Sequence, residues 1–300
     1  MTGSQPDFAS WVGDHVFTAT DLENYRLCPY RFYASAFLKL REEDPFEVEM
    51  SPAEIGSLVH RVLEKVLRTQ KAAPSLLNEE WARFTAGRPQ LSRPLIAFQR
   101  RRIERMLSSF TDDLERERAA ASDWTPRHFE WGFGQDSAPL VLKDADGRPA
   151  SFRGRIDRID VNERLKTFLV IDYKTGSTKI TGNQIKSGEA LQLPIYLLAV
   201  QRLLLKDYQP AGAVYYQLSD MSKKDGLLHA ERLPDYLEVG PRSSSYVPAA
   251  KWDGVLASIE ARIGETVSAI RKTAAFKSSP EPCEPFCPYQ DICRLRSATA

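Results

Sequence analysis

No hydrophobic stretch of this 300-residue sequence is long enough to span a lipid bilayer. The longest apolar run covers residues 193–200, whereas a membrane-spanning helix needs about 20 consecutive apolar residues. Residues 1–13 contain neither a basic start nor an apolar stretch, so they do not resemble a secretory signal. We therefore expect a cytoplasmic protein without a membrane partner.

Charge of one sign is not in excess either. The sequence has 41 Lys and Arg residues against 40 Asp and Glu residues, which gives a net charge of +1. A chain this balanced does not bind a polyanion with its whole surface, so a nucleic-acid site would have to be a local patch. The content of 42% hydrophobic and 27% charged residues is typical of a globular protein and excludes a mainly disordered or fibrous one.

Cysteine is scarce, and its positions are uneven. Cys28 stands alone near the N-terminus, whereas the other three follow the spacing Cys283-x3-Cys287-x5-Cys293 near the C-terminus. Without an export signal a disulfide framework is not expected, and the tight spacing favours a metal site. Four thiolates suit a structural zinc ion or an iron–sulfur cluster equally well. Unpaired or buried thiols are the remaining alternative.

A site shared by Cys28 and the cysteine cluster at residues 281–293 would tie the two ends of the chain together. Closing so long a loop costs about 5 kcal/mol of chain entropy. A metal site that forms only in the folded state can supply this free energy. We therefore expect an N-terminal helix clamped to the C-terminal tail, with residues 1–16 as a flexible leader.

Helical patterns dominate the first part of the chain. Thr20 and Glu23 have the spacing of a capping box, which predicts a helix that runs toward Cys28. A second helix is expected after Pro29, and a third follows Ser51 and Pro52 and continues to Leu67. The other segments that read as helical are 71–125, 188–205 and 249–272.

The pattern changes after Pro126, where short apolar runs alternate with Gly, Asp and Asn turn residues. The expected strands cover residues 129–133, 140–143, 151–160, 167–173 and 212–218. Strands interspersed with helices predict an α/β fold, with a central mixed sheet of four or five strands flanked by helices. Residues 17–300 are expected to form a single domain, with residues 71–125 as a helical insertion.

Charged residues gather where one predicted strand ends. Asp172 and Lys174 are two residues apart and therefore point to the same face of that strand. Asp157 lies on the preceding strand, and a hairpin could bring it beside Asp172. Two neighbouring carboxylates repel each other unless a cation neutralises them, and hard oxygen ligands suit Mg²⁺ or Mn²⁺. A surface salt bridge between Asp172 and Lys174 is the alternative for this pair taken alone.

Other polar residues occur close to this segment in the sequence. Gln192 and Tyr196 are four apart and share one face of a helix, where both can form hydrogen bonds and Tyr196 can stack on a base. Glu130 is a candidate outer acid. Arg155 shares a strand face with Asp157 and is the best candidate for a phosphate contact. The other arginines considered for this role are Arg153, Arg158 and the run 100–102.

Taken in order, these motifs resemble the PD-(D/E)XK nucleases of the RecB branch. The likeness is greatest to the iron–sulfur members, namely the AddB-type subunits of helicase-nucleases and the CRISPR-associated exonucleases. It covers nearly the whole chain, and includes Cys28-Pro29 followed by aromatic residues and Gly56-x-x-x-His60 on a helix. The segments that carry the resemblance are 20–33, 56–60, 154–160, 172–176, 192–196 and 283–293.

The resemblance implies a restriction-endonuclease-like α/β fold and a role for each matching residue. His60, Asp157 and Asp172 would ligate a divalent metal ion, with the backbone carbonyl of Tyr173 beside them. Lys174 would position or activate the attacking water. Because neutral imidazole binds Mn²⁺ better than Mg²⁺, we expect Mn²⁺ to support activity at least as well as Mg²⁺.

The same resemblance places Gln192 and Tyr196 against DNA, where they would support the site. It also implies a [4Fe–4S] cluster held by Cys28, Cys283, Cys287 and Cys293. The Cys-x3-Cys spacing departs from the Cys-x2-Cys that is more common in the family, which leaves zinc as an alternative.

The implied function is metal-dependent hydrolysis of DNA phosphodiester bonds, on single-stranded DNA or DNA ends, in recombination and repair. The sequence lacks the phosphate-binding pattern Gly-x-x-x-x-Gly-Lys-[Ser/Thr], so we expect any ATP-driven helicase to be another chain or to be absent. Two alternatives stay open: a DNA-binding module that no longer cuts, and an iron–sulfur or zinc scaffold that assembles a repair complex.

Overall fold

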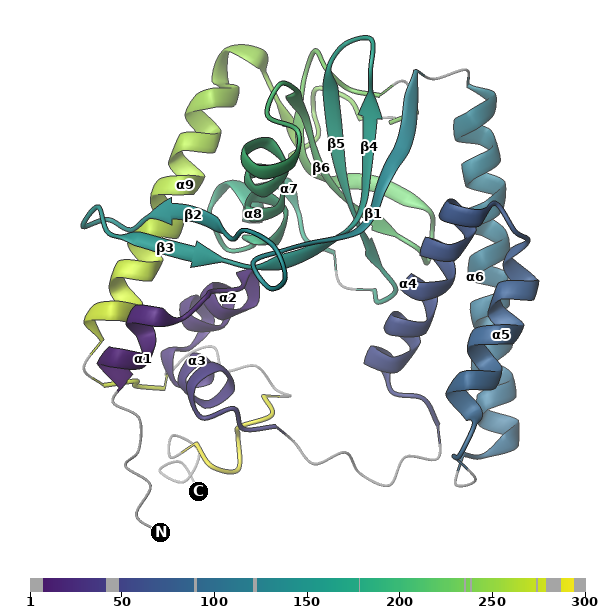
Figure 1. Ribbon diagram of the computed structural model, residues 1–300, viewed down its shortest axis with the longest axis horizontal. Helices are drawn as coiled ribbons and strands as arrows, with labels where there is room; N and C mark the ends of the chain where they lie inside the picture. The colour runs from purple at the N-terminus through teal and green to yellow at the C-terminus, as the bar shows by residue number, and fades with distance from the viewer. Residues whose placement is uncertain are drawn as a thin grey trace.

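The computed structural model describes residues 8–41, 49–88, 91–120, 123–177, 179–234, 236–237, 239–273, 275–278 and 287–293. It shows a mixed α and β structure, as the sequence predicts (Figure 1). Within the described ranges, no helix combines the length and the apolar character needed to cross a membrane.

A six-stranded mixed sheet forms the centre of the fold, in the order β1-β4-β5-β6-β7-β8. Its strands are β1 (Trp124–Phe133), β4 (Gly154–Asn162), β5 (Thr167–Lys174), β6 (Gln209–Gln217), β7 (Ser222–His229) and β8 (Tyr246–Val247). The pairs β5–β6 and β7–β8 are parallel, and the other neighbours are antiparallel. Helices connect β5 to β6, because a parallel pair needs a crossover rather than a tight turn.

The sheet has six strands where the sequence predicted four or five. The prediction missed β7, whose polar start shows no alternation of apolar residues, and β8, which is too short to carry a pattern. It also placed one strand over 151–160, where the chain forms two strands separated by Arg153. β2 (Leu140–Lys143) and β3 (Pro149–Phe152) pair with each other in a separate two-stranded sheet.

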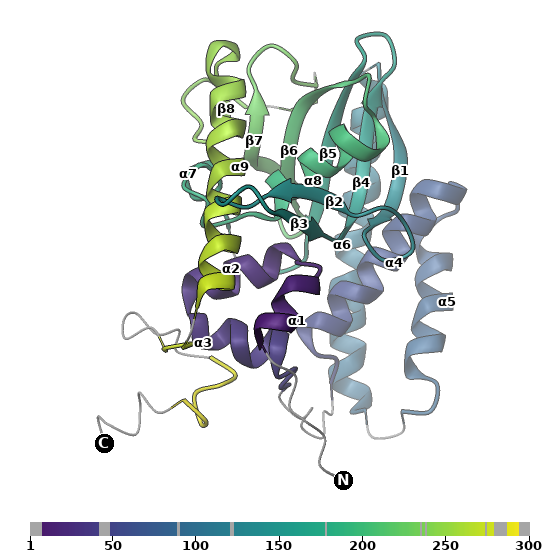
Figure 2. The same ribbon diagram turned by 60° about the vertical axis from the view of Figure 1, so that its left-hand side comes forward.

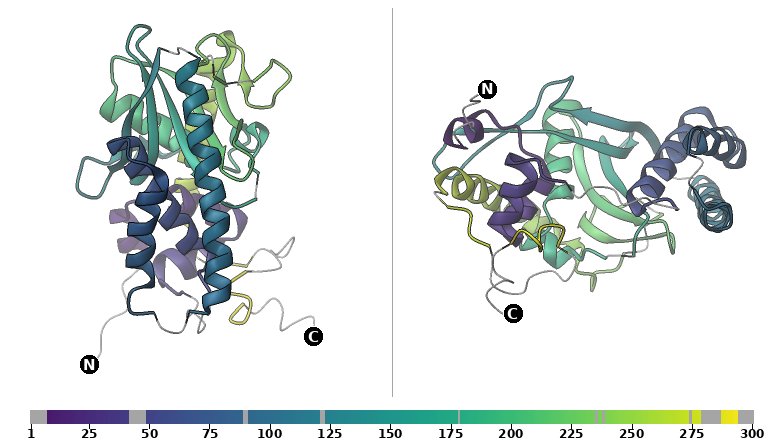
Figure 3. Two further views of the ribbon diagram at one scale, coloured as in Figure 1. Left: turned by 90° about the vertical axis from the view of Figure 1, so that its right-hand side faces the viewer. Right: turned by 90° about the horizontal axis from the view of Figure 1, so that it is seen from below.

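Helices cover both faces of the central sheet (Figures 1 and 3). One face packs against α4 (Pro52–Thr69), α5 (Ala73–Thr85) and α6 (Arg93–Ala119), and the other against α2 (Ala19–Leu27), α8 (Gln192–Ala199) and α9 (Ala249–Lys272). Ile171 of β5 belongs to the first core, whereas Val170 belongs to the second. Successive residues of a strand point to opposite faces, which explains why β5 is apolar from Phe168 to Ile171 and is buried on both sides there. The shorter helices are α1 (Phe8–Asp14), α3 (Pro29–Phe32), η1 (Tyr33–Phe37), α7 (Gly182–Lys186) and η2 (Val200–Leu204).

Helix α4 begins where the sequence predicts. Ser51 accepts the backbone N–H of Glu54 at 3.3 Å, and the Glu54 carboxylate accepts the N–H of Ser51 at 3.0 Å. Pro52 suits the first turn because the N–H that it lacks would have no partner there. The apolar face of α4 packs onto the sheet and brings His60 beside β4.

The start of α2 differs from the prediction. Thr18, and not Thr20, accepts the backbone N–H of Asp21 at 3.1 Å, and the Asp21 carboxylate accepts the N–H of Thr18 at 2.8 Å. Thr18 serves as the cap because its backbone is extended, whereas Thr20 already lies in the first turn. Glu23 therefore takes no part in a capping box and interacts with a different helix.

The N-terminal segment also departs from expectation. Residues 8–14 form α1 rather than part of a flexible leader. Val12 is 3% exposed, and the ring of Phe8 packs against that of Phe276 at 4.6 Å between centroids. Burial of these apolar side chains stabilises the helix. The segment is short and has no helical periodicity, so its sequence alone does not predict a helix. Residues 1–7 lie outside the described residues.

The described part of the C-terminal tail, 287–293, lies beside the N-terminal helices (Figure 2). The Tyr30 hydroxyl donates to the carbonyl oxygen of Ile292 at 3.4 Å. The Tyr289 hydroxyl donates to the carbonyl oxygen of Leu40 at 3.2 Å. These hydrogen bonds join segments that are about 250 residues apart in the sequence.

Candidate active site

The predicted acidic residues lie where β4 and β5 stop pairing. The register of the two strands ends with Arg158 opposite Ile171. Beyond this point, the Asp157 carboxylate accepts the backbone N–H of Tyr173 at 2.7 Å, so a side chain replaces a strand carbonyl as the acceptor. Asp157 and Asp172 are 8% and 3% exposed. The open end of the strand pair therefore brings two buried carboxylates together.

Asp172 and Lys174 form a closed network with α8. Lys174 Nζ lies 2.7 Å from Asp172 Oδ2 and donates to Gln192 Oε1 at 2.9 Å. Gln192 Nε2 in turn donates to Asp172 Oδ1 at 2.9 Å and to the Tyr196 hydroxyl at 3.2 Å. The four side chains that the sequence grouped by strand and helix periodicity thus contact one another directly.

His60 and Glu130 approach Asp157 from two other elements. His60 Nδ1 from α4 lies 3.2 Å from Asp157 Oδ1. Glu130 from β1 joins them, and the three residues offer ligand atoms that all lie within 4.8 Å of one another. Glu130 has a φ of +49°, in the left-handed region that is costly for a residue other than glycine. Such strain is frequent at functional sites, where the surrounding structure enforces it.

Sequence reasoning treated Glu130 only as an outer acid. Its neighbours Phe129 and Trp131 suggest an ordinary strand, which gives no indication of the left-handed backbone or of a place beside His60. The structure puts its carboxylate in the same cluster as His60 and Asp157.

The electrostatics of the site show an excess of negative charge. Burial raises the pKa of Asp172 to about 7, and the Asp157 charge adds to this rise while Lys174 opposes it. Burial and the Asp157 charge also raise the pKa of Glu130. Burial lowers the pKa of His60, but its hydrogen bond to Asp157 and the charge of that carboxylate outweigh burial and raise it. All three groups hold protons more tightly than they do in a free side chain.

This donor set fits a divalent metal ion. One imidazole nitrogen and carboxylate oxygens, gathered within 4.8 Å, are ligands of the kind that Mn²⁺ and Mg²⁺ accept. A cation at this place would also offset the Asp157 charge, which adds to the effect of burial in raising the pKa of Asp172 and Glu130. The structure therefore supports a metal site built from His60, Glu130 and Asp157, with Asp172 next to Asp157.

A groove of about 450 Å³ borders this network. Gln192 and Tyr196 form one wall, and the residues at the start of α2 form part of another. Arg153 and Arg155 also line it, and the Arg155 side chain is 65% exposed. The groove thus joins the acidic site to a locally basic surface.

Arg158 does not belong to that surface, and its predicted role as a phosphate contact is wrong. Its side chain is 1% exposed and donates to Asp160 at 2.6 Å and to Glu117 at 3.0 Å. The reason is the period of the strand, which turns Arg158 to the face opposite Asp157.

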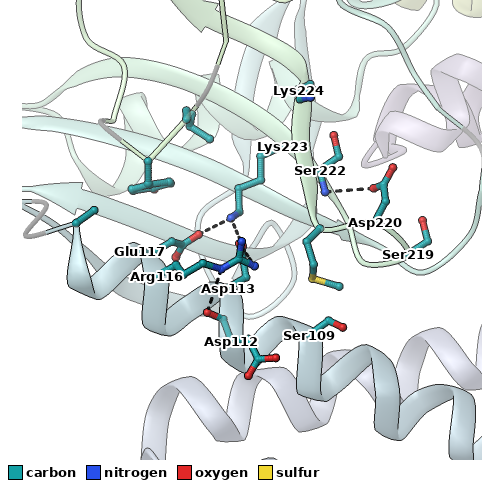
Figure 4. A pocket seen from close by; sticks show the side chains of 14 residues that line it. Ser109, Asp112, Asp113, Arg116, Glu117, Ser219, Asp220, Ser222, Lys223 and Lys224 are labelled. Atoms are coloured by element: carbon teal, nitrogen blue, oxygen red, sulfur yellow. Dashed lines mark hydrogen bonds and ion pairs between the residues drawn. The ribbon is translucent and has the colours of Figure 1, made fainter.

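A larger cavity, of about 650 Å³, lies on the α6 side of the sheet near the turn between β6 and β7 (Figure 4). Lys223 forms ion pairs with both Asp113 and Glu117 there, and Arg116 lies 3.2 Å from Asp113. These charges neutralise one another, and the residues of the acidic cluster do not line this cavity.

The cysteines are described only in part. Cys28 follows the last residue of α2, and Cys287 and Cys293 lie in the tail that contacts the N-terminal helices; all three are half-buried. Among the residues that the structure describes, no cluster of cysteine ligands is evident. Cys283 lies outside the described residues.

Comparisons with known proteins concern the chain as a whole. A model of the PD-(D/E)XK nuclease superfamily matches residues 16–294. The chain is 28% identical, over 80% of its length, to an ATP-dependent helicase/deoxyribonuclease subunit of Carboxydothermus hydrogenoformans, and 30% identical, over 66% of its length, to the corresponding subunit of Moorella thermoacetica. The matched regions make up 24% and 19% of those relatives, so the chain spans a quarter of their length or less.

Proposed function

Because the chain belongs to the PD-(D/E)XK nuclease superfamily, we propose that it is a metal-dependent deoxyribonuclease that hydrolyses phosphodiester bonds in single-stranded DNA or at DNA ends. The observation that carries this proposal is the cluster of His60, Glu130 and Asp157 beside the Asp172–Lys174 pair. Carboxylates that can hold a metal ion and a lysine that can orient a water molecule suit metal-assisted hydrolysis of a phosphodiester.

The metal ligands in this proposal are His60, Asp157 and Asp172, with Glu130 as a further ligand or as the acid next to them. The backbone carbonyl of Tyr173 completes the set that the family resemblance implies. A bound Mn²⁺ or Mg²⁺ would polarise the phosphate and stabilise the charge that develops on the leaving oxygen. The buried carboxylates hold this cation, and the raised pKa of Asp172 supports a need for positive charge.

Lys174 orients the attacking water in this scheme. An ammonium group has three N–H donors, and two of those of Lys174 are directed to Asp172 and Gln192. We assign the third donor to the water. Gln192 and Tyr196 support this arrangement, because the Gln192 amide bridges Asp172 and the Tyr196 hydroxyl.

The groove beside the site supports DNA as the substrate. A net charge of +1 provides no general attraction to polyanions, so phosphate contacts have to be local. Arg153 and Arg155 line the groove next to Gln192 and Tyr196. We propose that these arginines contact the DNA backbone and that Tyr196 lies near the nucleotide at the cleaved bond.

The relatives named above are helicase/deoxyribonuclease subunits. We propose by analogy that this nuclease acts with a helicase partner in DNA recombination or repair, inside the cell. The helicase would supply the ATP-driven opening of the duplex, and the present chain would cut the strand delivered to it.

We further propose that Cys28, Cys283, Cys287 and Cys293 hold a [4Fe–4S] cluster. Support comes from the tyrosine hydrogen bonds that hold the described tail against the N-terminal helices next to Cys28. A zinc ion is the alternative occupant. Metal analysis of protein purified without oxygen separates the two, because a colourless protein with stoichiometric zinc would overturn the cluster.

The decisive experiment is cleavage of end-labelled single-stranded DNA in the presence of Mn²⁺, Mg²⁺ or EDTA. We expect cleavage with Mn²⁺ at least as fast as with Mg²⁺, and none with EDTA. Asp172→Ala and Lys174→Ala should each lower the rate by about 100-fold or more, because they remove a ligand and the group that orients water.

A matched control is Asp220→Ala. Asp220 is an exposed carboxylate that lies 3.4 Å from Lys179, so its removal deletes an Asp–Lys pair outside the site. This variant should cut like the wild type. Substantial cutting by a folded Asp172→Ala or Lys174→Ala variant would refute the site, and no cutting by the folded wild type would favour a DNA-binding module or a scaffold.

A further inference from the structure

Glu23 of α2 forms its hydrogen bonds with a helix far away in the sequence. Its Oε1 accepts the backbone N–H of Leu191 at 2.7 Å and that of Gln192 at 3.2 Å. These residues begin α8, whose N-cap Leu191 has no side chain able to cap the helix. A carboxylate from α2 thus serves as the N-terminal cap of α8.

The cap matters because this helix end is buried. The first N–H groups of a helix have no partner within the helix, and a buried end without partners is costly. Leu191 and Leu193 are fully buried, and Pro194 has no N–H to satisfy. A negative group at a helix N-terminus is also favoured by the helix dipole. Glu23, itself half-buried, therefore supplies the acceptor that the first N–H groups of this largely buried helix end need.

The residue that Glu23 holds is also the one that organises the network. Gln192 is the first residue of α8, and its amide bridges Asp172 and Lys174. Fixing the backbone nitrogen of Gln192 therefore fixes the origin of that side chain. The Glu23 carboxylate is also near enough to Lys174 for the lysine charge to lower the pKa of Glu23. Burial nevertheless raises the pKa of Glu23 above its usual value.

We infer that Glu23 is a positioning residue of the nuclease: it acts through Gln192 to hold Asp172 and Lys174 in register for catalysis, without contacting DNA or metal. This inference rests on the proposed function. A purely structural cap would lower the stability of the protein when removed but would leave the rate of the folded enzyme unchanged. The two roles therefore predict different kinetics.

A double-mutant cycle separates them. Glu23→Ala is expected to lower kcat about 10- to 100-fold, because small displacements of catalytic groups have effects of this size, while the KM for DNA changes less than about twofold. Gln192→Ala should lower kcat at least as much. The double variant should be no slower than Gln192→Ala, because residues that act as one unit are not additive. A double variant slowed by the product of the two single factors would overturn the inference, as would a Glu23→Ala enzyme with the wild-type kcat.

Two further variants guard against loss of folding as the explanation. Glu23→Gln keeps an acceptor oxygen and is expected to retain most of the wild-type kcat, so a loss as large as that of Glu23→Ala would overturn the capping account. Glu189→Ala removes an exposed carboxylate just before α8 that bonds to Ser187 rather than to the helix. It should behave like the wild type in every assay, and a loss like that of Glu23→Ala would contradict the inference.

Hydrogen exchange tests the same contact without any nuclease activity. In Glu23→Ala the amides of Leu191 and Gln192 should exchange faster, with the rest of the sheet unchanged. Unchanged exchange at these amides would overturn the inference even if the wild type cuts DNA. If the wild type does not cut while exchange changes as expected, the proposed function fails and the contact stands.

Discussion

Asp172 is the residue through which pH acts most directly on the site. In the unfolded chain its pKa is near 3.8, whereas burial in the fold raises it to about 7. Between these two values, the folded protein holds a proton that the unfolded chain has released. Raising the pH through this window therefore lowers the stability of the metal-free protein. The raised pKa of Glu130 acts in the same direction.

A metal ion must displace these protons, which predicts pH-dependent stabilisation. We expect the gain in Tm on adding Mn²⁺ to be larger at pH 8 than at pH 6. Each group that must lose a proton weakens binding by up to about tenfold per pH unit below its pKa. Asp172→Asn removes one of these titrations and should reduce the difference, while His60, whose pKa is also raised, still titrates. Equal Mn²⁺-induced gains at both pH values in the wild type would contradict the prediction.

Glu130 predicts a second effect on metal binding. Its carboxylate lies in the cluster with His60 and Asp157, so Glu130→Gln should weaken Mn²⁺ binding about 10- to 100-fold. The measurement is a Mn²⁺ titration by calorimetry. Glu64→Gln is the control, because Glu64 is a nearby carboxylate on α4 that bonds to Arg68 instead. If the two variants bind Mn²⁺ alike, Glu130 is not part of the metal site.

At the scale of single residues, the period of secondary structure explains both what could be predicted and what could not. Asp172 and Lys174 share a strand face, and this placement follows from their spacing. Arg158 is a candidate phosphate contact by its place in the sequence, although the same period turns it away from Asp157. The contact of Glu23 with α8 could not be predicted from local sequence, because its partners lie 168 and 169 residues further along the chain.

At the scale of elements, the site depends on how closely α8 approaches the start of β4. Gly154 is the first residue of β4, and a Cβ atom at this position would lie 2.7 Å from Cε1 of Tyr196 and 2.9 Å from Cε1 of Phe133. The absence of a side chain is therefore what lets Tyr196 pack against the strand.

Gly154→Ala should accordingly disturb both stability and activity. We expect a loss of about 1–3 kcal/mol in the free energy of unfolding, which is typical of an overpacked site, and slower cleavage because Tyr196 is displaced. Urea unfolding and the cleavage assay measure the two effects. Gly176→Ala is a matched control, since a Cβ there meets nothing within 4 Å. If the Gly154→Ala protein is as stable as this control, the Tyr196 and Phe133 rings can move aside without loss of stability, and the prediction is wrong.

The elements were predictable where local signals agreed. Ser51, Pro52 and Glu54 specify the start of α4 by capping chemistry alone, and the structure confirms it. The start of α2 was misplaced because two overlapping pairs, Thr18 with Asp21 and Thr20 with Glu23, have the same spacing. In the structure the extended backbone of Thr18 makes it the cap, and Glu23 interacts with α8 instead, a tertiary contact that local sequence does not indicate.

At the scale of the whole molecule, the fold joins segments from opposite ends of the chain. α2 ends at Leu27, just before Cys28, and also carries Glu23, which caps the helix of Gln192. The described tail contacts the neighbouring N-terminal helices through Tyr30 and Tyr289. Loosening these contacts between the two ends would therefore affect the neighbourhood of a helix that also contacts the proposed catalytic network.

The proposed cluster predicts that one cysteine substitution loosens both ends of the chain. Cys287→Ser removes one of the four proposed ligands and should lose the iron and the brown colour that a [4Fe–4S] cluster gives. Because a ligand site formed only on folding also stabilises the fold, the variant should open more easily at both ends. Trypsin should then cut faster at exposed Lys39 and Lys277, by about tenfold for each 1.4 kcal/mol of local stability lost. Tyr289→Phe removes only the hydrogen bond to Leu40 and should keep both the iron and most of the protection. Cleavage by trypsin confined to one end in Cys287→Ser would mean that the cysteines do not clamp the N- and C-terminal segments together.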